Sequence, residues 1–238
     1  MVERISKIEK PADIICAHRG YKKPENTLMA FNNAIKAGAS WIEFDVHLTK
    51  DGEFIVWHDM TLKKLGLKKR PEIMNTAELK KLDLGNGQVM PTLAEVIKAF
   101  DGEINLNIEL KTASAGEELG NYLSSFTPKS SWVISSFFHD ALKLLDKKFD
   151  YNLGVLYVFP IKNYLKTALE INAYSINPFH YFASKKKIKK AHENGIRVIP
   201  WTIDKEKSII KIIERGADLI ITNETEKALK IAEKILQK

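Results

Sequence analysis

Short runs rich in β-branched and aromatic residues alternate with helical patterns along nearly the whole chain. Runs of the first kind, bounded by turn residues, are typical of strands, and apolar residues repeated every three or four positions are typical of helices. The pattern predicts strands at 13–17, 41–47, 104–110, 132–136, 153–158, 173–176, 197–201 and 218–222. It predicts helices at 27–37, 92–99, 115–124, 140–148, 161–170, 184–193, 205–215 and 225–236.

Eight strand–helix units in 238 residues give about 30 residues for each unit, which suits an α/β fold of the (β/α)8 TIM-barrel type. A doubly wound sheet more often stops at about five or six strands. No linker or repeat divides the chain, so we expect residues 1–238 to form a single barrel domain. The turn signal Lys50-Asp51-Gly52, with a strand-like run at 53–57, predicts a short hairpin-like insertion after the second strand.

Acidic residues follow the inward face of two neighbouring predicted strands. The apolar residues of the 41–47 run share one face, which must pack on helices, whereas Glu43 and Asp45 share the opposite face. An isolated pair of this kind more often lies on a solvated edge, but the next strand repeats the pattern with Glu109 and Lys111. Buried carboxylates are costly unless a cation neutralises them. Three of them at the catalytic end of a barrel indicate one divalent cation, Mg²⁺ or Ca²⁺.

Two histidines are predicted at the same end of the barrel. His18 ends the first strand run and is followed by Arg19, and His58 follows the hairpin strand beside Asp59. A single histidine at a strand end is more often structural than catalytic, but two of them near a metal site favour proton transfer. Arginine grips phosphate or carboxylate through two parallel hydrogen bonds, so Arg19 is a candidate anion-binding residue.

The other histidines carry weaker signals. His47 shares the inward parity of the acidic residues but is followed at once by the turn, so it is at most a neighbour of the site. No chemistry is assigned to His139, His180 or His192. The chain also lacks the Gly-x-Ser-x-Gly elbow, the phosphate-binding Gly-x-x-x-x-Gly-Lys-Ser/Thr loop and the dinucleotide fingerprint.

The chain is basic, with a formal net charge of +7 and a pI near 9.2. Its lysines concentrate at 63–70 and 185–190, without the interleaved aromatic residues that a nucleic-acid platform needs. We expect these clusters to be solvated faces and no nucleic-acid partner; attraction of an anionic substrate or an acidic membrane surface is the alternative.

Redox and targeting signals favour a cytoplasmic protein. Cys16 is the only cysteine, which excludes an intramolecular disulfide and a cysteine-based metal site. The stretch 171–184 is the longest without charge and is too short and polar to span a bilayer, and the amino-terminal residues contain no apolar signal core. We therefore expect no stable membrane anchoring and either a monomer or a small homo-oligomer.

Taken together, these motifs resemble those of the glycerophosphodiester phosphodiesterase family. The resemblance follows the family signature in order and spacing and spans most of the chain. It rests on Ala17-His18-Arg19-Gly20, Pro24-Glu25-Asn26-Thr27, Ala30-Phe31, Gly38, Glu43-Phe44-Asp45-Val46, Thr49-Lys50-Asp51-Gly52, His58-Asp59, Pro91-Thr92-Leu93-Ala94-Glu95, Glu109-Leu110-Lys111 and Trp201-Thr202.

The resemblance implies a (β/α)8 fold and hydrolysis of glycerophosphodiesters to glycerol phosphate and an alcohol, a reaction of lipid and glycerol metabolism. It implies that Glu43, Asp45 and Glu109 hold the divalent metal, with His18 and His58 as general base and acid. It also implies that Arg19 and Lys111 bind the phosphate. Attack by the substrate's own glycerol hydroxyl, through a cyclic phosphate, and direct attack by water both remain open.

Three further residues have two interpretations each. We expect Glu25 and Asn26 to contact the residues of the site rather than the substrate, and Glu25 could orient a histidine. The alternative for Asn26 is that it caps the helix that begins at 27. Trp201 either walls the glycerol pocket or simply packs at the barrel rim.

Two alternative functions use the same residues. Aromatic residues on the rim loops, at 137–138 and 179–182, would favour a lysophospholipase D-type lipid phosphodiesterase. A catalytically silent barrel that binds anions through its lysines is disfavoured, because every expected catalytic position is filled.

Overall fold

The computed structural model describes residues 10–159 and 163–236. Its strands are β1 (Ile15–His18), β2 (Trp41–Leu48), β3 (Phe54–Val56), β4 (Asn105–Leu110), β5 (Trp132–Ser136), β6 (Asn152–Tyr157), β7 (Ser175–Pro178), β8 (Arg197–Val198) and β9 (Ile220–Thr222). Its α-helices are α1 (Leu28–Lys36), α2 (Thr76–Leu79), α3 (Leu93–Phe100), α4 (Gly116–Leu123), α5 (His139–Lys148), α6 (Lys166–Glu170), α7 (Lys185–His192), α8 (Glu206–Glu214) and α9 (Thr225–Leu236). Short 3₁₀ helices are η1 (Pro11–Ile14), η2 (Lys63–Leu65), η3 (Pro71–Ile73) and η4 (His180–Phe182).

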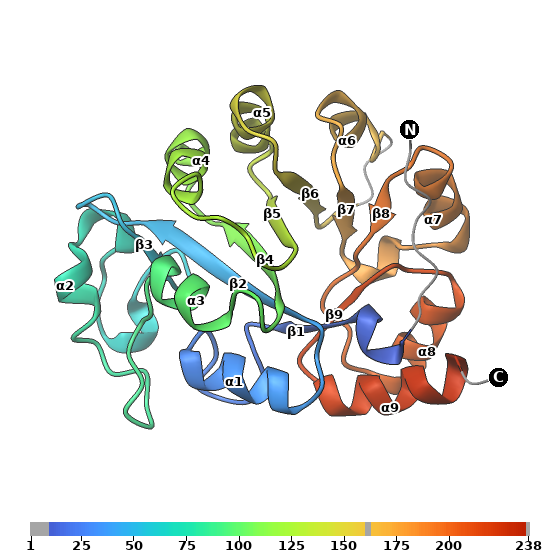
Figure 1. The fold of residues 1–238 in the computed structure, drawn as a ribbon, viewed down its shortest axis with the longest axis horizontal. Coiled ribbons are helices and arrows are strands. Elements are labelled where there is room, and N and C mark those ends of the chain that lie inside the picture. Colours follow the sequence, from blue (N-terminus) through green and yellow to red (C-terminus); the bar gives the residue numbers. More distant parts are fainter. Residues whose placement is uncertain (1–9, 160–162, 237–238) are drawn as a thin grey trace.

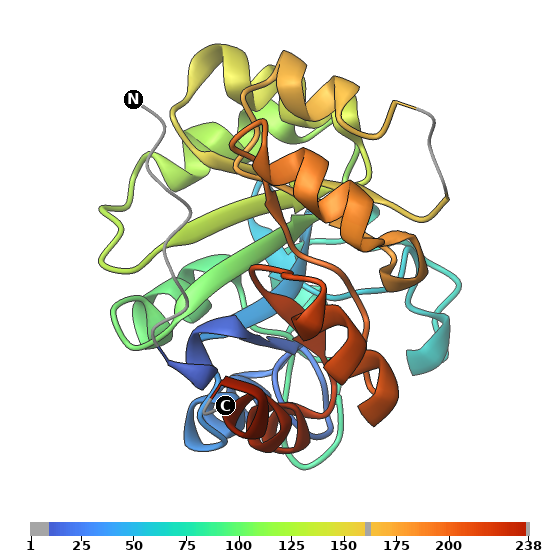
Figure 2. The ribbon, with the colours of Figure 1, turned by 90° about the vertical axis from the view of Figure 1, so that its right-hand side faces the viewer.

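The strands form one parallel sheet in the order β8-β7-β6-β5-β4-β2-β1-β9, with β3 antiparallel to β2. Backbone hydrogen bonds also join the two ends of this order, from Asp218 N to Val198 O (3.1 Å) and from Ile221 N to Pro200 O (3.1 Å). The sheet therefore closes into the predicted TIM barrel. Figure 1 shows the helices around its outside, and Figure 2 shows that α1 and α9, far apart in sequence, lie side by side.

Strand parity decides how the barrel is filled. The alternating apolar residues of β2 and β4, such as Phe44 and Ile108, are fully buried in the main core between strands and helices. Inside the barrel, a smaller apolar cluster around Cys16, Trp41 and Val133 lies near the strand starts. The acidic residues of the same strands lie further along, towards the carboxyl ends, as the sequence predicts.

The hairpin-like insertion is confirmed. Gly52 N donates to Thr49 O (3.2 Å) in the turn, and β3 then pairs with the end of β2. Residues 59–91, in which the sequence predicts no helix, form a small lobe with η2, η3 and α2. The lobe packs around a separate apolar cluster, in which Ile55 of β3 joins Leu62, Met74, Leu79 and Met90.

Two predicted elements are shorter in the structure. β8 covers only Arg197–Val198 instead of 197–201, because Pro178 of β7 has no N–H group to donate to Ile199 and Pro200 has none to donate to β9. The helix predicted at 161–170 covers Lys166–Glu170, and part of that prediction lies outside the described residues. Within the two described ranges, no helix is both long enough and apolar enough to cross a membrane.

Candidate active site

The predicted carboxylates meet at the carboxyl end of the barrel. β2 and β4 are neighbours in a register that pairs Asp45 with Glu109 and Glu43 with Asn107. One carboxylate oxygen from each of Glu43, Asp45 and Glu109 lies within 4.8 Å of the others, and all three residues are buried.

Burial and neighbouring charges together shift the pKa values of these three carboxylates in different directions. Burial, together with the charges of Asp45 and Glu109, holds the pKa of Glu43 well above its ordinary value. Burial and the Asp45 charge likewise raise the pKa of Glu109 to about 7. Burial alone would raise the pKa of Asp45, but the charges of Lys111, His58 and Arg19 outweigh it and keep that pKa below its usual range.

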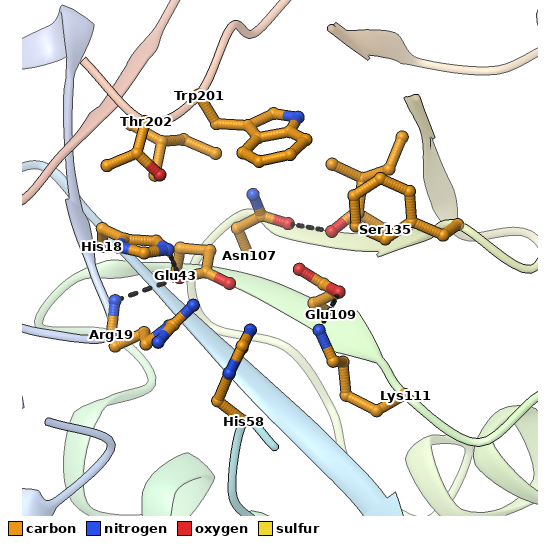
Figure 3. Close-up of a pocket in the computed structure, with 13 residues that line it drawn as sticks. His18, Arg19, Glu43, His58, Asn107, Glu109, Lys111, Ser135, Trp201 and Thr202 are labelled. Atoms are coloured by element: carbon orange, nitrogen blue, oxygen red, sulfur yellow. Dashed lines mark hydrogen bonds and ion pairs between the residues drawn. The ribbon is translucent and has the colours of Figure 1, made fainter. Parts of the chain in front are cut away.

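Two cations reach into the acidic cluster. Lys111 Nζ donates to Glu109 Oε1 at 2.6 Å and lies 3.3 Å from Asp45 Oδ1. Arg19 Nε lies 3.4 Å from Asp45 Oδ2, and the backbone N–H of Arg19 donates to Glu43 Oε2 at 3.0 Å (Figure 3). The same cations are placed to meet the anionic oxygens of a ligand in the pocket.

The cluster also fits a metal ion. The buried atom Asp45 Oδ1 makes no hydrogen bond with any residue that the structure describes, although Lys111 is near. A buried acceptor without a partner is uncommon and calls for a ligand or ion. Three carboxylates in a small volume are the oxygen donors that hard divalent cations prefer.

A strained loop after β1 carries Arg19 into the site. Arg19 has a φ of 56°, in the left-handed region, and Gly20 follows with a φ of 81°. A Cβ on Gly20 would lie 2.7 Å from the backbone carbon of Ala30, so only glycine lets the loop approach α1 this closely.

The predictions for Asn26 and Glu25 can be compared with the contacts that these residues make. Asn26 Nδ2 donates to Asp45 Oδ2 at 2.9 Å, so Asn26 contacts the acidic cluster. The cap of α1 is Thr27, whose hydroxyl accepts from Ala30 N; the capping alternative for Asn26 was therefore wrong. The expectation that Glu25 orients a histidine was also wrong, because Glu25 accepts instead from Arg19 at 3.1 Å.

His18 lies at the end of β1 with its Nε2 atom 3.9 Å from Glu43 Oε2. Its Nδ1 atom lies 2.8 Å from Asn223 Oδ1. Burial, assisted by the adjacent Arg19 charge, lowers the pKa of His18 to about 4, so the imidazole is neutral at physiological pH.

His58 enters the site from the start of the lobe, and in Figure 3 its ring lies between the Arg19 and Lys111 side chains. Its Nδ1 atom lies 2.7 Å from Asp59 Oδ1, and Lys64 forms a further ion pair with Asp59 at 2.9 Å. Burial lowers the pKa of His58, while the Asp45 charge and the Asp59 contact oppose that change.

A pocket of about 160 Å³ lies between the two histidines. Trp201 forms one wall and packs edge-on against Phe137, with ring centroids 5.5 Å apart, while its Nε1 donates to Asn177 O at 2.9 Å. Trp201 thus both lines the pocket and packs at the rim. A second pocket, of about 460 Å³, shares His58, Glu109, Lys111 and Phe137 with the first.

Sequence reasoning missed two polar residues of the pocket. Asn107 is buried and accepts from the Ser135 hydroxyl at 2.9 Å, and both side chains line the pocket (Figure 3). The inward parity of Asn107 on β4 was the available signal, whereas Ser135 stands in an apolar run that shows no such signal.

The remaining histidines have other contacts. His47 is fully buried and lies 3.0 Å from Glu72 Oε1 in the lobe, and His192 lies 2.8 Å from Asp218 Oδ2. His139 Nε2 donates to Leu156 O at 2.8 Å, which fixes the start of α5.

Comparisons with known proteins agree with the motifs. The model of the glycerophosphoryl diester phosphodiesterase family matches residues 18–227. A glycerophosphodiester phosphodiesterase of Caldanaerobacter subterraneus subsp. tengcongensis is 33% identical, over 93% of this chain and 98% of the relative. One of Bacillus altitudinis is 32% identical over the same shares of both chains.

Solved structures share the fold. The glycerophosphodiester phosphodiesterase of Thermotoga maritima is similar with a TM-score of 0.76 and 32% identity, over 92% of this chain and 97% of its own. A phosphodiesterase of Oleispira antarctica, in complex with the product sn-glycerol-3-phosphate, matches with a TM-score of 0.86 and 24% identity, over 92% and 96% of the chains. The barrel, the motifs and the match over residues 18–227 lead to one conclusion: this chain belongs to the glycerophosphoryl diester phosphodiesterase family, a family of enzymes.

Proposed function

We propose that the protein hydrolyses glycerophosphodiesters to glycerol phosphate and an alcohol. The observation that carries this proposal is the convergence of two imidazoles, two cations and three buried carboxylates on one pocket. A phosphodiester needs cations to stabilise the charge that grows on its oxygens and proton carriers at its attacking and leaving groups. The pocket contains all of these groups.

The two histidines differ in the partner of their Nδ1 atoms, and this difference sets their roles. His18 is neutral, and its Nδ1 atom contacts an uncharged amide, so it accepts a proton from the attacking hydroxyl or water. His58 contacts the Asp59 carboxylate, which opposes the lowering of its pKa by burial, so of the two histidines it is the one that donates a proton to the departing alcohol.

Arg19 and Lys111 bind the phosphate oxygens from the side of the acidic cluster. Glu43, Asp45 and Glu109 hold one divalent cation, Mg²⁺ or Ca²⁺, which when bound supplies Lewis-acid stabilisation of the phosphoryl charge. Asn26 holds the Asp45 carboxylate in place, and Trp201 forms the wall against which the glycerol moiety packs.

The test is release of choline and glycerol phosphate from glycerophosphocholine, with and without a chelator. We expect release that stops with chelator and returns when Mg²⁺ or Ca²⁺ is added in excess. Absence of release with every divalent ion would contradict the proposed substrate. Undiminished release in the presence of chelator would contradict the proposed metal requirement.

The second pocket favours a second candidate, a lysophospholipase D-type activity on the same site. It opens beside His58, where the departing alcohol would lie, and its wall includes the apolar side chains of Met60, Phe137 and Phe138. Replacing Met60 by Ser would lower kcat/KM for lysophosphatidylcholine more than for glycerophosphocholine if this pocket takes an acyl chain. Leu144→Ser, at a similarly exposed apolar position on α5 outside this pocket, is the matched control.

A further inference from the structure

Asn223 contacts His18 from outside the first pocket, and Asp204 in turn contacts Asn223. Asn223 directly follows β9, which pairs with β1 through Ala17 and Thr222, so the ends of the two strands bring Asn223 beside His18. Asp204 reaches the same place because Ile203 N donates to Ile221 O (2.9 Å) where the barrel closes. The three side chains form a chain from Asp204 through Asn223 to His18.

Asp204 determines which way the Asn223 amide faces. Asn223 donates to Asp204 twice, from its backbone N to Oδ1 and from Nδ2 to Oδ2, each at 2.8 Å. An ionised carboxylate only accepts hydrogen bonds, so the NH₂ group of Asn223 must face Asp204. Its Oδ1 atom then faces His18.

The direction of the Asn223 amide fixes the proton on His18. A carbonyl oxygen only accepts, so the contact of 2.8 Å requires the proton of neutral His18 to be on Nδ1. The Nε2 atom, on the Glu43 side of the ring, then carries the lone pair. We propose that Asp204 and Asn223 are positioning residues that hold His18 in the Nδ1–H tautomer, with Nε2 ready to accept a proton in the pocket.

This inference rests on the proposed function, because a base is needed only if His18 takes part in the reaction. It also explains why an amide stands beside His18 while a carboxylate stands beside His58. An amide acceptor sets the tautomer without adding a further negative charge beside Glu43, which lies 3.9 Å from the other ring nitrogen of His18.

The test is the substitution Asp204→Asn, read by ¹⁵N NMR of the His18 ring and by steady-state kinetics on glycerophosphocholine. The new amide keeps an acceptor for Asn223 N but presents its NH₂ group to the Asn223 side chain. Asn223 then turns its own NH₂ group towards His18, and the ring proton moves to Nε2. We expect the parent to show Nδ1–H, the variant to show Nε2–H, and kcat to fall about 10-fold or more with KM changed less than about threefold.

Two further variants make the result interpretable. Asn223→Ala, at an exposed position, removes the acceptor, and we expect a mixture of the two tautomers and a smaller fall in kcat. Asp101→Asn is the matched control, because Asp101 also accepts several hydrogen bonds but lies at the other end of the barrel, before β4. It should alter the stability of the protein and leave the His18 ring signals and kcat unchanged.

The outcomes separate this inference from the proposed function. An Nε2–H tautomer in the parent, or ring signals that do not change in Asp204→Asn and Asn223→Ala, would overturn the positioning role. Expected ring signals in a protein that hydrolyses no glycerophosphodiester would leave the tautomer assignment standing and overturn the proposed function instead.

Discussion

His47 Nδ1 lies 3.0 Å from Glu72 Oε1, and this contact connects the end of β2 to η3 in the lobe. The His47 side chain is completely buried, whereas Glu72 also pairs with the exposed guanidinium of Arg70 at 3.3 Å. Burial would raise the pKa of Glu72, but the hydrogen bonds from His47 and Arg70 outweigh it and lower that pKa to about 2. Because the lobe begins at Asp59, next to His58, this contact also supports one wall of the candidate site.

We predict that Glu72→Ala lowers the free energy of unfolding by about 1–3 kcal/mol, since it leaves a buried imidazole without its partner. Amide hydrogen exchange within 59–91 should become faster than in the parent. Arg70→Ala removes the exposed partner of the same carboxylate and should cost no more than about 1 kcal/mol. Equal losses in the two variants would show that the buried contact is not what holds the lobe.

Substitution of either candidate catalytic histidine should have a large kinetic effect. We predict that His18→Ala and His58→Ala each lower kcat on glycerophosphocholine by about 10²-fold or more, with the fold intact, as is usual for a general acid or base. His192→Gln is the control, because this histidine contacts Asp218, which lies before β9 at the far end of the barrel. Turnover near that of the parent would remove the substituted histidine from the mechanism.

Arg19 should not tolerate lysine. Its guanidinium contacts Glu25 at 3.1 Å and Asp45 at 3.4 Å, and a lysine ammonium cannot reach both while also meeting phosphate oxygens. We predict that Arg19→Lys lowers kcat/KM by about 10-fold or more, since a charge-assisted bidentate contact is lost. Lys23→Arg, a change at an exposed lysine of the same loop, should be nearly silent. Full activity of Arg19→Lys would exclude bidentate phosphate binding by this residue.

The alternation of strands and helices was sufficient to predict the barrel, because each strand buries a full apolar face under a helix. The lobe could not be predicted in the same way. Its helices are only three or four residues long, and its apolar cluster combines residues as distant as Ile55 and Met90. Helical periodicity needs about 11 residues or more before it becomes a signal. The short β8 depended on Pro178 and Pro200, which each remove a backbone donor from one of the two neighbouring pairings.

The same limit applies to the site. Parity along β2 and β4 was enough to bring Glu43, Asp45, Glu109 and Lys111 together, because strand register follows from burial of the opposite face. The contact of His18 with Asn223 depends instead on the pairing of β9 with β1, and the contact of Asn223 with Asp204 depends on barrel closure. A local sequence pattern does not predict either contact. Asn223 does follow a predicted strand directly, so the rule that barrel sites lie at carboxyl strand ends could have singled it out.

The contact between His192 and Asp218 should make stability depend on pH. The hydrogen bond with Asp218 raises the pKa of His192 above its ordinary value, although partial burial opposes this. A pKa raised in the folded state means that the stabilisation is complete below the unfolded-state pKa and is lost as the pH rises through the folded-state pKa. We predict that His192→Gln destabilises the protein clearly at about pH 5.5 and much less at about pH 8.5. Urea denaturation of both proteins at the two pH values tests this; an equal loss at both would exclude an ionic contribution.

Metal removal should lower the melting temperature. Two conservative substitutions should distinguish the effect of the bound ion from the effect of each carboxylate charge. A divalent ion that binds only the folded protein stabilises it by about 2.7 kcal/mol at a hundred times its dissociation constant. For a chain of this size that corresponds to a rise of roughly 5–10 °C, which a chelator should reverse. Both Glu43→Gln and Asp45→Asn should be inactive and should no longer respond to Mg²⁺ or Ca²⁺.

Without metal, the same two substitutions should change the melting temperature in opposite directions. The raised pKa of Glu43 shows that its charge is unfavourable where it lies, so Glu43→Gln should melt as high as the metal-free parent or higher. Asp45 instead lies 3.3 Å from Lys111 and 3.4 Å from Arg19, so Asp45→Asn removes a buried counter-charge that both cations share and should melt several degrees lower. Thermal scans of the three proteins, with chelator and with each ion, provide the measurement. An ion-dependent shift of equal size in all three would show that the metal binds elsewhere, because neither carboxylate could then be one of its ligands.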